Sequence, residues 1–396
     1  MSLSRSIAEI ADSAGVRACS DWFRKERAWI NEQHLKLCRV PAPTFFEQKR
    51  AEWMAEKFRS LGWEAKIDRA GNVIATRPGA GDAQLAVTAH LDTVLAPRSP
   101  EDIKVAPDGR LLGPGVSDNG AGLAALIALA AVWNEHRRVD AAPALVANVG
   151  EEGEGNLSGM RYLCRPSNGS RFRAFLVLDG PNTDHITCQA LASRRFDVTF
   201  TGSGGHSWSD YGIGNPVHAL SRAVTLFIDA APNGNGPRSS FNFGLIEGGS
   251  SINSIPAEAR AKVDLRSESA ERIDEMAALL AAQVERAAEI ENAGRIGAKV
   301  NARVKEIGSR PGGGLSENAP MLEMMRAVDA FLGLRSQLNC SSTDANIPLS
   351  LGIPAISIGT GGQGGGAHTA AEWFSPEGRE VGLRRVFLAL CLLLSS

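Results

Sequence analysis

Three short apolar runs, each followed at once by ionisable side chains, constrain the fold of this chain more than any other feature. They occupy residues 85–89, 142–149 and 175–178. Nearly unbroken apolar runs of this length are typical of buried central strands, which carry helices on both faces. The sequence therefore predicts a buried sheet in an α/β fold.

The ionisable residues come where the predicted strands end. His90 and Asp92 follow the first run, Glu151 and Glu152 the second, and Asp179 the third. Ligands of open α/β sheets bind in the crevice beyond the carboxyl ends of the strands. We therefore expect these side chains to converge on one site.

A different pattern fills the middle of the chain. Residues 193–208, 239–249 and 257–266 alternate apolar and polar positions, as half-exposed strands do. Helical stretches at 214–230 and 270–292 lie between and after them. This order predicts a small α+β domain inserted into the α/β domain.

The domain boundaries follow from where this pattern starts and stops. We assign residues 1–187 and 309–396 to the catalytic domain and residues 188–308 to the insert. Ahead of the sheet, residues 17–60 carry helical apolar spacing with a break at Pro41 and Pro43, which predicts two helices.

Composition excludes several classes of function. The formal net charge is −2, so no basic field attracts nucleic acid or an anionic membrane. The N-terminus lacks the basic start and apolar run of a signal peptide, and the late apolar run 386–394 is too short to span a bilayer. The six cysteines show no C-x-x-C spacing. We expect a cytoplasmic protein that binds neither nucleic acid nor membrane.

His90 and Asp92 point to the same side of a strand, because side chains two residues apart do so. A zinc-ligating histidine normally donates its other ring N–H to a carboxylate, so the pair fits a metal site. The alternative is a buried histidine beside an aspartate that caps the next turn. Asp118 either binds metal or caps the helix that follows it.

Glu151 and Glu152 are harder to explain without a cation, because two adjacent carboxylates after a buried strand repel each other. His368 follows three glycines, which permit close backbone approach to a ligand; the alternative is a histidine in a surface loop. A hydrolase with two zinc ions needs a bridging carboxylate, further oxygen and imidazole ligands, and one carboxylate as a base. The chain supplies all of these groups.

Seven segments, spread over nearly the whole chain, carry a resemblance to a known family. They are AHLDTV, GPGVSDNGAG, VGEEGEGNLSG, FLVLDG, GSGGHSW, SINSIPAEARAKVDLR and GTGGQGGGAHTAAEW. In this order and spacing they resemble the dizinc metallopeptidases that include aminoacylases, succinyl-diaminopimelate desuccinylase, glutamate carboxypeptidase and the tripeptidase peptidase T. The resemblance implies a zinc-peptidase-like α/β/α catalytic domain with an inserted α+β, ferredoxin-like domain for lid closure and dimerisation.

The resemblance also implies a role for each site residue. Asp118 would bridge two Zn²⁺ ions, or two Co²⁺ or Mn²⁺ ions. His90 and Asp179 would complete one metal, and Glu152 and His368 would complete the other. Glu151 would be the general base, and Asp92 would orient His90.

The resemblance also implies roles for three residues of the insert. His206 is similar to the family histidine that reaches a neighbouring subunit's active site and stabilises the oxyanion, which implies a homodimer through the insert. Asn253 and Arg266 match positions that hold a substrate carboxylate. The alternatives are a turn residue for Asn253 and a surface charge for Arg266.

The expected function is hydrolysis of a peptide or N-acyl amide bond of a small substrate, of the exopeptidase or aminoacylase type. One departure from the family pattern is Asn119-Gly120 after Asp118, where many relatives have Asp, Met or Gly and then Lys. The identity of the substrate therefore stays undetermined, and the alternatives to an amide include ureido compounds and esters. A catalytically silent metal-binding or scaffolding relative of the same fold is the alternative from another class of function.

Overall fold

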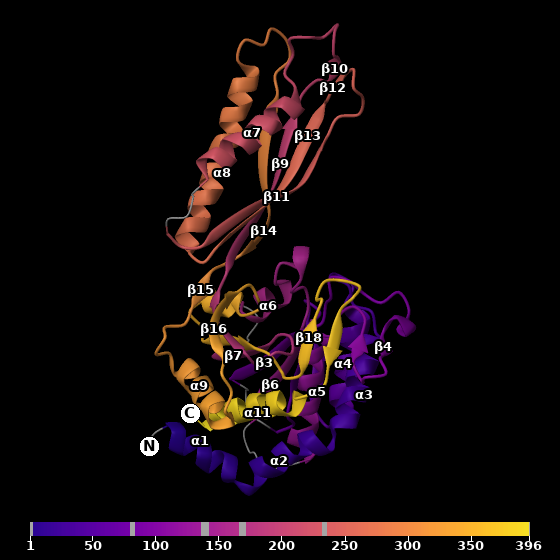
Figure 1. Ribbon diagram of the computed structural model, residues 1–396, viewed down its shortest axis with the longest axis vertical. Helices are drawn as coiled ribbons and strands as arrows, with labels where there is room; N and C mark the ends of the chain where they lie inside the picture. The colour runs from indigo at the N-terminus through magenta and orange to yellow at the C-terminus, as the bar shows by residue number, and fades with distance from the viewer. Residues whose placement is uncertain (1–2, 80–83, 136–141, 166–171, 232–235, 396) are drawn as a thin grey trace. The chain divides into compact units, whose positions relative to one another are not determined.

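The computed structural model describes residues 3–79, 84–135, 142–165, 172–231 and 236–395, which form two compact units (Figure 1). Unit 1 comprises Met1–Ala190 and Gly313–Ser396, and unit 2 comprises Leu191–Gly312. Each unit has a hydrophobic core of its own, and each is described by itself.

A mixed nine-stranded sheet forms the centre of unit 1. Its strands are β1 (Glu64–Ile67), β2 (Val73–Thr76), β3 (Leu85–His90), β6 (Ala144–Asn148), β7 (Ala174–Leu178), β8 (His185–Ala190), β15 (Gly313–Gly314), β16 (Gln337–Ser341) and β17 (Ala355–Ile358). They follow the order β1-β2-β6-β3-β7-β17-β8-β15, and β16 pairs with β8. The central strands β6, β3, β7 and β17 are parallel, so their carboxyl ends lie at one edge of the sheet.

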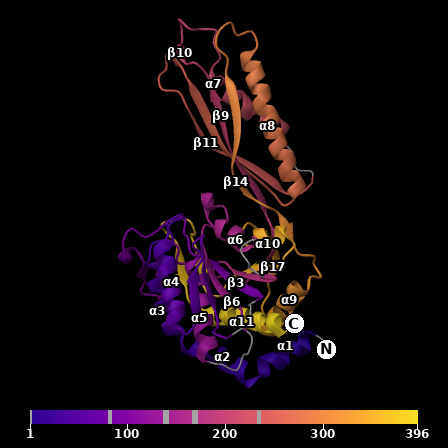
Figure 2. The same cartoon turned by 180° about the vertical axis from the view of Figure 1, so that it is seen from behind.

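Side chains of the central strands alternate between two cores. On β3, Val87 and Ala89 face one core and Ala86 faces the other. The helices that cover the first core include α4 (Gln48–Ser60), α5 (Gly120–Glu135), α9 (Pro320–Leu332) and α11 (Arg379–Ser395). Helices α6 (Ser158–Leu163) and α10 (Asn346–Ser350) cover the second core. Figures 1 and 2 show the sheet between α6 and α11, which confirms the predicted α/β/α class.

Four helices precede the sheet, so the prediction of two was wrong. They are α1 (Leu3–Asp12), α2 (Ala14–Lys25), α3 (Arg27–Cys38) and α4. Ser13 separates the first two because its side chain accepts a hydrogen bond from the Val16 N–H and caps α2. In the part of the chain that the structure describes, no helix has the length and hydropathy needed to cross a bilayer.

A small second sheet in unit 1 brings two loops together. It has the order β18-β19-β5-β4, from β18 (Gln363–Gly365), β19 (Trp373–Ser375), β5 (Leu111–Leu112) and β4 (Lys104–Val105). Trp373 pairs with Leu112, and Phe374 pairs with Leu111. The loop that carries Asp118 therefore lies beside the loop that carries His368.

Unit 2 has the ferredoxin-like fold that the sequence predicted. Its strands β9 (Ala192–Thr201), β11 (Ser239–Gly248), β13 (Glu258–Ser267) and β14 (Asn301–Arg310) form an antiparallel sheet in the order β11-β13-β9-β14. Helices α7 (Pro216–Ala230) and α8 (Ala270–Asn292) share one core with the sheet, so both cover the same face. The unit begins and ends a few residues later than the predicted insert, 188–308, because β8 stays in the large sheet to Ala190 and β14 runs to Arg310.

Candidate metal centre

Three of the predicted site segments lie at the edge where the parallel strands of unit 1 end. His90 is the last residue of β3, Glu151 and Glu152 come shortly after β6, and Asp179 directly follows β7. Since β3 pairs in parallel with both β6 and β7, the fold brings these side chains to one place. The buried apolar strands thus explain why the charged residues meet.

Asp118 sits in the loop before α5, and its neighbour Asn119 caps that helix. The Asn119 Oδ1 atom accepts a hydrogen bond from the Gly122 N–H at 3.1 Å, and its Nδ2 donates to the Leu178 carbonyl at 2.8 Å. Asn119 thereby ties this loop to the end of β7, next to Asp179. Because Asn119 is the cap, the Asp118 carboxylate faces other partners.

Glu372 holds the Asp118 loop from the opposite side. Its buried carboxylate accepts hydrogen bonds from the backbone N–H groups of Gly115 at 2.7 Å, Ser117 at 2.7 Å and Asp118 at 2.9 Å. The Ser117 hydroxyl donates a fourth at 2.7 Å. Since Glu372 comes four residues after His368, it joins the loops that carry two of the predicted ligands. Glu372 was not predicted from the sequence to be part of the site.

The predicted ligands form three overlapping groups whose nitrogen and oxygen atoms lie within 4.8 Å of one another. The groups are His90 with Asp118 and Asp179, His90 with Glu151 and Glu152, and Asp118 with Glu152 and His368. Asp118 takes part in two of them with different oxygens. Its Oδ1 lies 3.1 Å from His90 Nε2, and its Oδ2 lies 3.0 Å from His368 Nε2.

The remaining distances complete this arrangement. His90 Nε2 is 4.0 Å from an Asp179 oxygen, and His368 Nε2 is 2.9 Å from a Glu152 oxygen. His368 has a positive φ of 65°, which is uncommon for residues other than glycine and is frequent at functional sites. Asp118 thus lies between two imidazoles, and each imidazole lies near one further carboxylate, Asp179 or Glu152. This set of donors fits two neighbouring divalent ions.

Asp92 organises the turn that carries the two glutamates. Its carboxylate accepts the backbone N–H of Glu151 at 3.0 Å and that of Glu152 at 2.9 Å. The His90 Nδ1 atom lies 3.0 Å from the Asp92 carbonyl and 3.5 Å from its carboxylate. A proton on Nδ1 directs the Nε2 lone pair of His90 toward Asp118 and Asp179.

Burial and mutual repulsion dominate the electrostatics of the site. Burial, followed by the charge of Glu151, raises the pKa of Glu152 to about 8. The hydrogen bond to Asp118, against opposing burial, raises the pKa of His368 to about 9. Burial opposes ionisation of Asp118, yet hydrogen bonds from both imidazoles hold its pKa below the usual range. The cluster of carboxylates favours additional positive charge, which divalent cations supply.

Asp344 is a second residue near the site that was not predicted from the sequence. It is buried, and its carboxylate accepts a hydrogen bond from the Asn148 amide at 2.7 Å. Burial, followed by the charge of Glu151, raises its pKa to about 8. A buried carboxylate whose pKa is raised by the charge of Glu151 is a signal that only the folded chain provides, since Asp344 is distant in sequence.

The other three predicted residues belong to unit 2. His206 lies in β10 (Gly205–His206), which pairs with β12 (Ser254–Ile255), and the Ser207 N–H donates to the Asn253 carbonyl at 3.0 Å. The His206 Nδ1 atom accepts backbone N–H groups of Trp208 and Ser209, so its proton is on Nε2. Arg266 lies near the C-terminal end of β13, away from His206 and Asn253, and donates to Asp264 at 2.7 Å.

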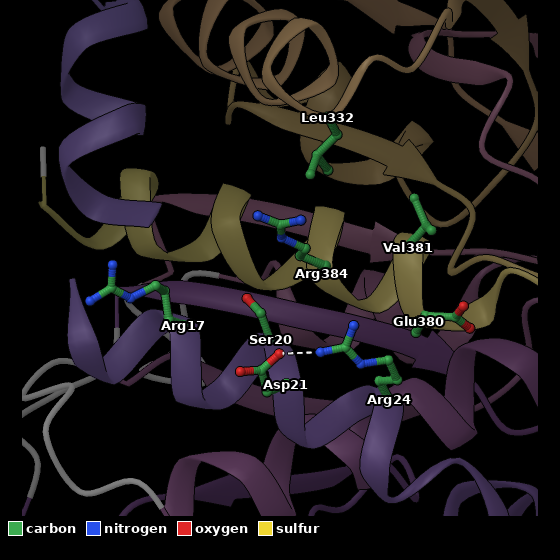
Figure 3. Close-up of a pocket in the computed structure, with 8 residues that line it drawn as sticks. All are labelled: Arg17, Ser20, Asp21, Arg24, Leu332, Glu380, Val381 and Arg384. Carbon is green, nitrogen blue, oxygen red and sulfur yellow. Dashed lines mark hydrogen bonds and ion pairs between the residues drawn. The ribbon is translucent and has the colours of Figure 1, made fainter. Parts of the chain in front are cut away.

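A separate hollow of about 390 Å³ in unit 1 contains none of the predicted site residues (Figure 3). It lies among α2, the end of α9 and α11, and its lining includes Arg17, Arg24, Arg384 and Glu380. Arg24 donates to Asp21 at 2.5 Å, which is the dashed line in Figure 3. The hollow carries charges of both signs.

Comparison with known proteins identifies the family of the chain. Residues 86–391, which contain all five predicted ligands and the proposed base, match peptidase family M20/M25/M40. The chain is a member of this family. It is therefore a metallopeptidase or amidohydrolase that acts on amide bonds.

Individual relatives of the M20 family extend the match. An uncharacterised protein of Bacillus subtilis (strain 168), YqjE, is 25% identical over 83% of this chain and 89% of its own. A tripeptidase from Staphylococcus aureus superposes with a TM-score of 0.76 at 21% identity, over 93% of this chain and 99% of the other. The YXEP protein of Bacillus subtilis, a dinuclear metal-binding peptidase of the M20 family, has a TM-score of 0.68 at 15% identity, over 94% and 99%. At these identities the structural likenesses establish a shared fold.

Proposed function

We propose that this M20 family member is a dizinc hydrolase that cleaves a peptide or N-acyl amide bond of a small substrate. The observation that carries the proposal is the set of three ligand groups that share His90, Asp118 and Glu152. The dinuclear metal-binding relative supports two ions. Asp118 is proposed as the bridge because its two oxygens face different imidazoles. Zn²⁺ suits the carboxylate and imidazole donors, and Co²⁺ or Mn²⁺ suits them as well.

Two divalent cations at this site would activate a water molecule and polarise the scissile carbonyl. Glu151 accepts the proton of the attacking water and returns it to the leaving nitrogen, as a general base and then a general acid. Asp92 fixes the backbone of the Glu151–Glu152 turn, so the base is held in place before substrate binds.

Unit 2 supplies the second part of the proposal. The Nε2–H of His206 points away from its backbone partners and is a donor suited to an oxyanion. In the proposed homodimer it acts on the active site of the partner subunit. Asn253, which is adjacent to His206 through the Ser207–Asn253 hydrogen bond, and Arg266 would each bind a substrate carboxylate. Because they lie near opposite ends of β13, in the proposed homodimer they would reach one substrate from different subunits.

The tripeptidase among the structural relatives supports a small peptide as substrate, and the sequence relatives include a cytosol non-specific dipeptidase and a succinyl-diaminopimelate desuccinylase. The first experiment is metal analysis of the purified protein, with hydrolysis of a panel of dipeptides, tripeptides, N-acyl amino acids and N-carbamoyl compounds. We expect two metal ions per chain and cleavage that a chelator abolishes. Little metal and no cleavage after addition of zinc, cobalt or manganese would favour a silent metal-binding relative.

The role of Glu151 is tested by Glu151→Gln, which keeps the size of the side chain and removes the base. We expect turnover to fall by about 10²- to 10⁴-fold while metal content stays unchanged. Glu154→Gln is the matched control, because Glu154 is an exposed carboxylate three residues away. Near-normal turnover in the Glu151 variant would refute the assignment.

A further inference from the structure

Two adjacent phenylalanines of unit 1, Phe45 and Phe46, are exposed next to the candidate metal centre. Their relative exposures are 63% and 74%, whereas most large apolar side chains of this unit are buried. Both belong to the short segment between α3 and α4. Exposed aromatic pairs cost solvation free energy, and clusters of them mark binding surfaces.

The residues on either side of the two phenylalanines contact the catalytic turn directly. The Thr44 hydroxyl donates to the Asp92 carboxylate at 3.0 Å, and that carboxylate also accepts the Glu152 N–H. The Glu47 carboxylate accepts the Gly150 N–H at 3.1 Å. Phe45 and Phe46 are therefore anchored, at both ends of their segment, to the groups that hold the proposed base and a proposed ligand.

A second apolar pair extends the surface. The Thr93 N–H donates to the Ala42 carbonyl at 3.0 Å, and Pro43 and Thr93 form a parallel β-bridge. Val94 and Leu95, which come next, are 44% and 43% exposed. Phe45 and Phe46 follow one of these hydrogen-bonded segments, and Val94 and Leu95 follow the other. The Asp92 side chain, which accepts from Thr44 and from Glu152, connects both segments to the metal centre.

The backbone at Phe45 is strained. Its φ is 75°, a left-handed conformation that bulky side chains rarely adopt and that glycine adopts freely. Strain of this kind persists where the surrounding structure fixes it, and it is concentrated at ligand sites. A phenyl ring at a strained and exposed position therefore marks a candidate ligand site.

We propose that Phe45, Phe46, Val94 and Leu95 form an apolar subsite that binds a large hydrophobic side chain of the substrate next to the scissile bond. This inference rests on the proposed function and specifies its substrate class. The occupant is a substrate side chain because the segments that carry the patch are hydrogen-bonded to the catalytic turn. The metal centre cleaves the bond, and the patch selects which substrates are cleaved efficiently.

The experiment measures kcat/KM for Ala-Ala, Phe-Ala and Ala-Phe and for the matching N-acetyl amino acids. We expect wild-type protein to prefer one phenylalanine position over alanine by at least about tenfold, since apolar pockets discriminate on this scale. Phe46→Ser should reduce that ratio about tenfold, and Phe46→Leu should restore most of it. Phe45→Gly removes the ring while it keeps the positive φ accessible, and it should also reduce the ratio.

Phe331→Ala is the control, because Phe331 is an exposed phenylalanine on α9. It should leave the ratio as in wild type. Metal content and oligomeric state are measured for every variant. The expected result is unchanged metal content with a changed ratio.

The alternative results overturn the inference in different ways. Cleavage with equal efficiency on alanine and phenylalanine substrates, or a ratio that the Phe45 and Phe46 variants do not change, removes the subsite and leaves the proposed function intact. Loss of metal in these variants would mean that the segment only supports the catalytic turn. A shift from dimer to monomer with an unchanged ratio would assign the patch to contact between copies. No cleavage by wild type removes the proposed function and the subsite together.

Discussion

In both units carboxylates lie close together on a sheet, but the basic side chains that pair with them differ. In unit 2, arginines pair with acids across neighbouring strands of the sheet. Arg194 pairs with Glu306 at 2.6 Å, and Arg260 pairs with Asp197 at 2.6 Å. At the edge of the unit 1 sheet, Asp118 and Glu152 pair instead with His90 and His368.

The difference separates a structural surface from a reactive one. An arginine keeps its charge at any ordinary pH, so the carboxylates of unit 2 need no further partner. An imidazole carries positive charge only while it is protonated, and a neutral imidazole is a metal ligand. The carboxylates of unit 1 therefore become balanced when divalent cations replace protons, and four predictions test this contrast.

The largest effect is expected for Asp118→Asn, which removes the charge of the carboxylate that both imidazoles share. Metal content should fall from two ions per chain to less than one, and turnover should be lost, because each metal loses a ligand. Metal analysis after dialysis and the dipeptide assay measure both. Asp108→Asn, at an exposed aspartate of the same unit, is the control. Two retained ions in the Asp118 variant would remove it as the bridge.

Metal binding should release protons. Without metal, the raised pKa values of about 8 for Glu152 and about 9 for His368 keep both groups protonated at neutral pH. Since ligands must be deprotonated, affinity should rise with pH and become constant above the higher pKa. Between about pH 6 and pH 8 we expect at least a hundredfold increase, at tenfold per pH unit for each proton released.

Titration calorimetry in two buffers with different ionisation enthalpies counts the protons released. Affinity that is constant between about pH 6 and pH 8 would contradict the raised pKa values and the contrast with the arginine pairs.

A smaller effect is expected for Glu372→Gln, because Glu372 touches the backbone of the Asp118 loop and no predicted ligand side chain. An amide has one acceptor oxygen in place of two, so some of the four hydrogen bonds to the loop are lost. Metal affinity should fall about 10- to 100-fold, as for other groups that orient ligands. Glu377→Gln, at an exposed glutamate nearby, is the control. Unchanged affinity would mean that the loop holds its shape without Glu372.

The smallest effect is expected in unit 2 for Glu306→Gln. The Arg194–Glu306 pair is partly exposed, and such ion pairs contribute little to stability. The melting temperature should shift by no more than about 2–4 °C, and metal content should not change. A calorimetric scan and metal analysis measure these quantities. A loss of metal would show that the two charged regions are not independent.

The sequence predicted much of the fold because its signals are local. Apolar runs mark β3, β6 and β7, and alternating residues mark β9, β11 and β13. The number of N-terminal helices was predicted wrongly because the apolar spacing at 17–60 begins after α1 and runs across Glu26, where α2 ends and α3 begins. The α1 segment packs against α9 and α11 in the folded unit.

For the site, the sequence by itself determined the donors: histidines, aspartates and glutamates at the ends of buried strands, where any α/β sheet would place them. Only the tertiary structure decided how they are held. Asn119 caps α5 in place of Asp118, Glu372 fixes the Asp118 loop, and Asp344 reaches the vicinity of Glu151. Strand ends are set by local pattern, whereas hydrogen bonds between distant loops exist only after the chain has folded, and for that reason no spacing in the sequence encodes them.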